Sequence, residues 1–185
     1  MRFLFGACAV WLFILSGGLG CGASGASAPA TDAPQTISIT STAFDPSSAI
    51  PAKYTADGQN VSPPLAWANA PAKMAALVLI VEDPDAPGPV PFTHWVVANL
   101  PPQTSGLQEG AVDLPAAAVQ GRNDFGRVGY GGPSPPPGRV HHYHFRVYAV
   151  DAMLNLGDAP DRAAVLAALA GHVLAWGELV GTYQR

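Results

Sequence analysis

One stretch, Leu77 to His94, limits the fold more than any other part of the chain. It reads LVLIVEDPDAPGPVPFTH and begins with five apolar residues, which acidic residues and prolines then stop. A short apolar run with such ends is typical of a strand that is covered on both faces. Prolines at positions 84, 87, 89 and 91 remove four backbone donors. The segment after the strand is therefore predicted to be a stiff loop and not an inner strand.

Two carboxylates enter this loop directly from the predicted strand. Asp83 and Asp85 are separated by Pro84, and in an extended segment their side chains would point to one side about 6.6 Å apart. His94 then opens a second apolar run, WVVA at 95–98. An imidazole at the start of a strand, soon after two carboxylates, predicts a polar site at the ends of the strands.

A second stretch, 121–143, supplies more polar side chains. Its first eighteen residues contain six glycines and four prolines, which predicts an ordered loop at best. The segment 140–151 is predicted to be a strand because it is rich in aromatic and β-branched residues. The alternation of side chains along a strand places His141 and Tyr143 on one face and His142 on the other. Only one of these faces can line the same site as the two aspartates.

The end of the chain changes from a strand pattern to a helix pattern. Asp158 is a candidate N-cap, Pro160 suits a first helical turn, and the segment 161–176, DRAAVLAALAGHVLAW, is rich in helix formers. We therefore predict one helix here, with Gly171 as a candidate break, that packs on the sheet. Several short strands followed by one helical region indicate a mainly β, mostly antiparallel domain with a C-terminal helix.

Length and composition favour one well-covered domain. The chain has 185 residues, of which 49% are hydrophobic and 12% are charged. It can therefore bury one sizeable core but is too short for two large domains. We assign this domain to residues 37–185. The formal net charge of -4 is opposite in sign to that of a typical nucleic-acid-binding protein, so no nucleic-acid partner is expected.

The first twenty residues have the pattern of a leader peptide. Arg2 precedes an apolar run that ends in small residues before Cys21. This pattern predicts a secretory signal at 1–20 and not a membrane-spanning helix. The four residues that end at Cys21, GLGC, resemble the bacterial lipoprotein box, in which the cysteine is lipidated. Residues 21–36 are rich in Ala, Ser, Gly and Pro and are predicted to form a flexible tether.

The number of cysteines agrees with this interpretation. Cys8 lies inside the leader, so the mature chain keeps at most one cysteine and can form no internal disulfide. The alternative is an unmodified secreted protein, cut by an ordinary signal peptidase after the ASA motif at 26–28, although Pro29 disfavours that cut. Either route predicts an exported protein of the cell envelope. The first predicts a lipoprotein that is anchored to a membrane through Cys21 and faces the periplasm or the exterior.

Four motifs, taken in order along the chain, resemble the phosphatidylethanolamine-binding protein (PEBP) or Raf kinase inhibitor-like family, and within it the bacterial YbhB/YbcL type. They are DPDAP at 83–87, HW at 94–95, GYGGPSPP at 129–136 and HHY at 141–143. Each motif is weak alone, but their combination and order are specific, and the resemblance covers the whole domain. It implies a large central antiparallel β-sheet packed on a smaller sheet, with a small anion-binding pocket at one end.

The resemblance also implies which residues form that pocket. Asp83 and Asp85 match the paired aspartates of the family, and His94 matches its first pocket histidine. Two residues depart from the family pattern: Ser134 replaces a cysteine that is common in bacterial relatives, and His142 stands where arginine is usual. The other matched positions are the glycine–proline wall and two residues of the HHY motif, namely Gly132, Pro133, Pro135, Pro136, His141 and Tyr143.

Two imidazoles, a phenol and two carboxylates suit a small ligand that carries phosphate. Imidazolium and phenol groups donate hydrogen bonds to phosphate oxygens, and a carboxylate can receive an ammonium group. We therefore expect a binding protein for small phosphorylated or anionic ligands, such as phospholipid head groups, with no cofactor and no metal. Arg122, Arg127 and Arg139 flank the loop and either attract anions or are simply solvated.

Two other functions stay open at the level of the sequence. Asp and His side chains are also zinc ligands, so a metal-dependent hydrolase could use the same cluster, although no known metal-ligand spacing such as HExxH is present. A protein-interaction or inhibitor module is the other alternative, for which the family supplies a precedent. A homodimer is compatible with the sequence.

Overall fold

The computed structural model describes residues 32–185. The predicted leader at 1–20, the candidate lipidation residue Cys21 and most of the predicted tether lie outside the described residues. Within residues 32–185, no helix has the length and the apolar character that crossing a membrane would require.

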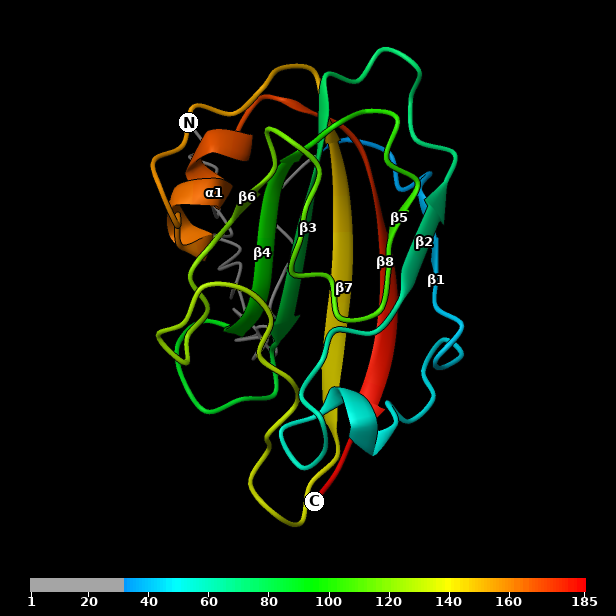
Figure 1. Ribbon diagram of the computed structural model, residues 1–185, viewed down its shortest axis with the longest axis vertical. Coiled ribbons are helices and arrows are strands. Elements are labelled where there is room, and N and C mark those ends of the chain that lie inside the picture. The colour runs from blue at the N-terminus through cyan, green and yellow to red at the C-terminus, as the bar shows by residue number, and fades with distance from the viewer. Residues whose placement is uncertain (1–31) are drawn as a thin grey trace, which may run out of the picture.

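Two antiparallel β-sheets form the body of the domain (Figure 1). The smaller sheet has the order β1-β2-β5, and the larger sheet has the order β6-β4-β3-β7-β8. This arrangement confirms the predicted mainly β class. The elements in chain order are β1 (Ser38–Thr40), the 3-10 helix η1 (Ala52–Tyr54), β2 (Leu65–Ala68), β3 (Ala76–Asp83), β4 (Phe92–Leu100), β5 (Gly106–Leu107), β6 (Val119–Gln120), β7 (His141–Val150), α1 (Arg162–Leu169) and β8 (Val173–Tyr183).

Strand β3 is the buried centre of the larger sheet. All eight of its residues are buried, as its apolar run predicts. Its side chains alternate between two cores. Leu77 and Leu79 pack with Trp95 and Phe145 between the two sheets, whereas Ile80 belongs to a second cluster that α1 covers on the opposite face. Because β3 lies between β4 and β7, its polar end is held at a fixed place beside both neighbours.

The helix near the C-terminus is shorter than the sequence pattern predicts. The carboxylate of Asp161 accepts a hydrogen bond from the backbone N of Ala164 at 2.8 Å, so Asp161 and not Asp158 is the N-cap. The helix ends at Leu169, and Gly171 then adopts a left-handed φ of +80°, which glycine tolerates without steric cost. The prediction of a helix that continues to 176 is therefore wrong.

The residues after this turn form β8, which pairs with β7. Buried and half-buried positions alternate along β8, with Ala175 and Leu179 in the core. A Cβ atom at Gly177 would collide with the backbone carbonyl of Ile37, so the glycine lets the chain before β1 lie against β8. Pairing with the whole of β7 outweighs the local helix propensity of the first β8 residues.

The last residues of the predicted tether, 33–36, lie alongside β8. The backbone N of Trp176 donates to the carbonyl of Pro34 at 3.1 Å, and the indole Nε1 donates to the carbonyl of Ala33 at 3.2 Å. The backbone N of Ile37 donates in turn to the carbonyl of Trp176 at 3.1 Å. The contact of the chain with the larger sheet therefore begins before residue 37, where we placed the domain boundary.

Candidate functional site

The polar side chains singled out in the sequence meet at one end of the larger sheet. In the antiparallel register, Asp83 at the end of β3 lies opposite Phe92 at the start of β4. On the other side of β3, Glu82 lies opposite His144, near the start of β7. The end of the central strand is thereby placed beside the first residues of both neighbours, which brings His94 and His141 to the same region.

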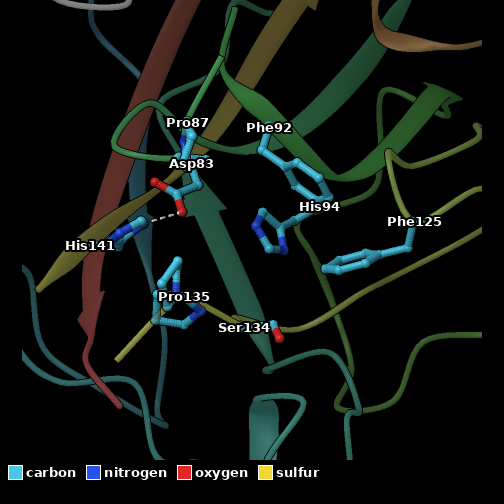
Figure 2. A pocket seen from close by; sticks show the side chains of 10 residues that line it. Asp83, Pro87, Phe92, His94, Phe125, Ser134, Pro135 and His141 are labelled. Carbon is cyan, nitrogen blue, oxygen red and sulfur yellow. Dashed lines mark hydrogen bonds and ion pairs between the residues drawn. The ribbon is translucent and has the colours of Figure 1, made fainter. Parts of the chain in front are cut away.

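A pocket of about 260 Å³ opens at this end of the sheet. Figure 2 shows His94, in that view, between the pair Asp83–His141 and the ring of Phe125. The walls are largely apolar, and the polar groups are few, as in most small-molecule sites. The lining residues are Asp83, Ala86, Pro87, Phe92, His94, Phe125, Ser134, Pro135, Pro136 and His141.

Asp83 and His141 form a buried pair in the pocket wall. The Nδ1 atom of His141 lies 2.7 Å from Oδ2 of Asp83, and each side chain is about 95% buried, with exposed fractions of 5% and 4%. Because a carboxylate accepts, Nδ1 carries the proton, which leaves Nε2 as the ring nitrogen available to a ligand. The other carboxylate oxygen, Oδ1, accepts from the backbone N of Asp85 at 2.8 Å.

His94 is a buried histidine whose ring is hydrogen-bonded to a backbone carbonyl. Its Nδ1 atom donates to the carbonyl of Gly131 at 2.6 Å, so the neutral ring has Nε2 as its unprotonated nitrogen. Burial lowers the pKa of His94, and the carbonyl of Gly131 and the charge of Asp83 oppose that effect without cancelling it. At neutral pH the ring is therefore mainly uncharged. A proton on Nε2 would convert it into a donor for an anion.

Tyr143 supports the pocket and does not line it. Its ring lies edge-on to His94, with ring centroids 5.1 Å apart and an interplanar angle of 80°. Its hydroxyl is buried and has no hydrogen-bond partner within residues 32–185. Burial, followed by the nearby charge of Asp83, raises the pKa of Tyr143 far above its usual value, so the phenol stays protonated.

Asp85 does not line the pocket, contrary to the prediction that both aspartates face one side. The chain turns at Pro84 and is not extended, because the backbone N of Asp85 bonds back to Asp83. The carboxylate of Asp85 instead accepts from Nδ1 and from the backbone N of the exposed His142, at 2.7 and 2.8 Å. Burial would raise the pKa of Asp85, but these hydrogen bonds from His142 outweigh it and lower the pKa.

The glycine–proline wall divides between two places. Pro135 and Pro136 line the pocket, Gly132 lines a neighbouring pocket, and Pro133 is buried and lines neither. The backbone N of Gly132 donates to Oδ1 of Asn60 at 2.7 Å, and the carbonyl of Pro133 accepts from the backbone N of Ala56 at 2.9 Å. These two bonds hold the loop against the segment that follows η1.

Two aromatic residues in the pocket wall escaped the sequence analysis. Phe92 lies two positions before His94 in β4, so the period of a strand could have placed both side chains on one face. Phe125 lies in the glycine-rich loop and carries no such signal. Its ring packs edge-on against Phe92, with centroids 4.8 Å apart, and lies 5.5 Å from the ring of His94.

In the part of the chain that the structure describes, no group of three or more His, Cys, Asp or Glu side chains is arranged to hold a metal ion. Asp83 and His141 are directly hydrogen-bonded, and His94 bonds to a backbone carbonyl. The metal-ligand set that a metal-dependent hydrolase would need is thus not assembled at this site.

Comparisons with known proteins identify relatives of this chain by sequence and by fold. The sequence profile described as phosphatidylethanolamine-binding protein matches residues 40–184. A UPF0098 protein of Methanothermobacter thermautotrophicus is 49% identical over 146 residues, which is 77% of this chain and 95% of that relative.

Two solved structures share both sequence and fold with this chain. A phosphatidylethanolamine-binding protein homologue from Chlamydia trachomatis is 41% identical, with a TM-score of 0.75 over 82% of this chain and 99% of its own. Escherichia coli YbcL, described as a member of the mammalian PEBP family, is 32% identical, with a TM-score of 0.77 over 81% of this chain and 99% of its own.

Proposed function

Because the chain belongs to the phosphatidylethanolamine-binding protein family, we propose that it binds the phosphate-bearing head group of a small amphiphilic ligand in the pocket beside His94 and His141. The observation that carries this proposal is the convergence of the buried pair Asp83–His141 with His94 around one cavity of about 260 Å³. The polar groups are too few for a large polar ligand, but they suit one compact charged group.

The chemistry of the pocket favours a zwitterion over a simple anion. The hydroxyl of Ser134 can donate to phosphate oxygens, and so can the Nε2 atoms of His94 and His141 once they carry a proton. The carboxylate of Asp83 can receive an ammonium group. Neither Lys nor Arg lines the pocket, so a ligand that carries its own positive charge would leave Asp83 better balanced than phosphate alone.

Titration calorimetry with O-phosphoethanolamine tests this assignment. We expect the double variant His94→Gln, His141→Gln to lose at least about tenfold in affinity at a pH where the wild type binds, because each histidine that carries a proton on Nε2 in the complex contributes a charge-assisted hydrogen bond. The matched control is His172→Gln, because His172 is exposed and pairs with Asp151 away from the pocket. Unchanged binding in the double variant, or equal loss in the control, would show that the site assignment is wrong.

We further propose that the protein is exported and held at the cell envelope. The support is the leader pattern at 1–20 and the single cysteine of the mature chain at Cys21. A lipid on Cys21 would keep the domain close to a membrane that carries phosphate head groups. The anchor would then hold the ligand pocket near the membrane whose head groups it is proposed to bind.

A further inference from the structure

A second pocket, of about 250 Å³, lies directly beside the first. The two pockets share Phe125 and Ser134 as lining residues, so these side chains form the partition between them. The second pocket differs in chemistry from the first. Its polar lining residues are Asn60, Asn123, Arg127 and the shared Ser134, and it contains no carboxylate.

Arg127 is an exposed residue that brings a positive charge to the lining of this second pocket. Within residues 32–185, its guanidinium pairs with no carboxylate. Among the described residues, Lys53, Arg146, Arg162 and Arg185 pair with acids, whereas Lys73, Arg122 and Arg139 do not. Of the unpaired cations, Arg127 is the one that lines this pocket. A guanidinium in a pocket without a counter-ion is a site for a carboxylate or a phosphate, because its planar donors match both.

The backbone of the Arg127 loop is held in place by one buried side chain. Oδ1 of Asn123 accepts from the backbone N of Phe125 and of Arg127, both at 3.1 Å, and Nδ2 of Asn123 donates to the carbonyl of Gly129 at 2.9 Å. The backbone N of Asn123 donates to the carbonyl of Arg127 at 2.8 Å. Arg127 therefore extends from a pre-formed loop, which reduces the ordering cost of binding.

Asn60, which also lines this pocket, supplies a second donor. Its Oδ1 accepts from the backbone N of Gly132, which leaves the two hydrogens of Nδ2 without a partner within residues 32–185. Gly132 allows this approach because a Cβ atom there would lie 2.5 Å from the carbonyl of Tyr54 and 2.7 Å from Oδ1 of Asn60. One cation and one free amide donor thus face a single cavity.

We infer that the second pocket binds a second anionic group, a carboxylate or phosphate, of a ligand whose first phosphate occupies the pocket beside His94 and His141. This inference rests on the proposed function of the first pocket. The ligand would be two-headed, with an aliphatic linker that crosses the partition of Phe125 and Ser134. The half-exposed ring of Phe125 offers an apolar surface for such a linker.

Calorimetry with two matched series of compounds tests the inference. The first series consists of ω-phosphonoalkanoates such as 3-phosphonopropionate, 4-phosphonobutyrate and 6-phosphonohexanoate. The second consists of alkylphosphonates of the same chain lengths. At an ionic strength of about 0.15 M, which screens long-range attraction, we expect the carboxylate to tighten binding about tenfold at one chain length and little at the others.

Two variants test whether Arg127 is the residue that binds the added carboxylate. Arg127→Gln should abolish the advantage of the phosphonoalkanoate and leave the affinity for the alkylphosphonate unchanged. Arg139→Gln is the matched control, because it removes the same charge from an exposed residue that lines neither pocket. An equal loss in both variants would mean long-range attraction and would overturn the assignment of the second pocket.

The remaining outcomes separate this inference from the proposed function. Equal affinities of the two series at every chain length would overturn the second site while the first site stands. A wild-type protein that binds no alkylphosphonate and no O-phosphoethanolamine would overturn both.

Discussion

The Nδ1 atom of His141 lies 2.7 Å from Oδ2 of Asp83, although 58 positions separate the two residues in the chain. The same loop and the same strand supply a second pair, in which Nδ1 of His142 lies 2.7 Å from Oδ2 of Asp85. The first pair is buried in the pocket wall, and the second is largely exposed. The two adjacent pairs thus have the same N–O distance and differ in their access to water.

This difference predicts unequal losses of stability. Asp83→Asn should lower the free energy of unfolding by about 1–3 kcal/mol, because it leaves a buried hydrogen-bond donor without its partner. Asp85→Asn should lower it by less than about 1 kcal/mol, because water can replace an exposed partner. Urea denaturation of both variants measures the two values. A larger loss for Asp85→Asn would contradict the burial of the first pair.

The lowered pKa of His94 predicts a dependence of stability on pH. The unfolded chain takes up a proton on this histidine near its usual pKa of about 6.5, whereas the folded protein does so only at lower pH. The contribution of His94 to stability is therefore complete above that pH and is lost as the pH falls. The stability difference between wild type and His94→Gln should shrink from about pH 7 to about pH 5. A difference that grows toward acid would refute the buried neutral state.

The same pKa predicts that binding of a phosphodiester strengthens in acid. Glycerophosphoethanolamine keeps its charges constant from about pH 8 to about pH 5, so only the protein titrates. Protonation of Nε2 of His94 adds a donor for the phosphate, and affinity should rise by up to about tenfold per pH unit below the usual histidine pKa. His94→Gln keeps the pair Asp83–His141 and should flatten the profile. Calorimetry across this pH range measures the affinity, and an affinity that falls in acid would contradict the prediction.

The close contact of β8 with the chain before β1 predicts a sensitive glycine. Gly177→Ala should destabilise the protein by about 1–3 kcal/mol, because the added methyl group meets the backbone of Ile37. Gly157→Ala is the control, since a Cβ atom there has nothing within 4 Å, and its effect should stay within about 0.5 kcal/mol. Thermal or urea unfolding of both variants measures the two values, and equal effects would contradict the close approach of Ile37 to β8.

The proposed anchor predicts a modified N-terminus. When the full-length chain is expressed in a bacterium with lipoprotein processing, labelled fatty acid should enter the wild type and not Cys21→Ser. The wild type should sediment with membranes, and the variant should not. An N-terminal sequence that starts at Pro29, with no label, would instead identify an ordinary secreted protein.

Much of the site could be predicted from local sequence. The parity of β7 places His141 and Tyr143 on one face, and the end of an apolar run marks Asp83 at the end of β3. Both predictions depend only on the two-residue alternation of side chains along a strand and on the position where the apolar run gives way to polar residues. The position of Asp85 could not be obtained in this way, because a hydrogen bond from its own backbone to Asp83 turns the chain at Pro84.

Local sequence determined that β3 would be a buried strand, because its apolar run is short, rich in branched side chains and bounded by acidic residues and prolines. Three-dimensional packing decided the rest. Residues 173–176 favour a helix by propensity but become the start of β8, since β7 offers backbone partners and Ile37 a close contact only in the folded state. Phe125 likewise enters the pocket wall through contacts with Phe92 and His94, which no short-range pattern encodes.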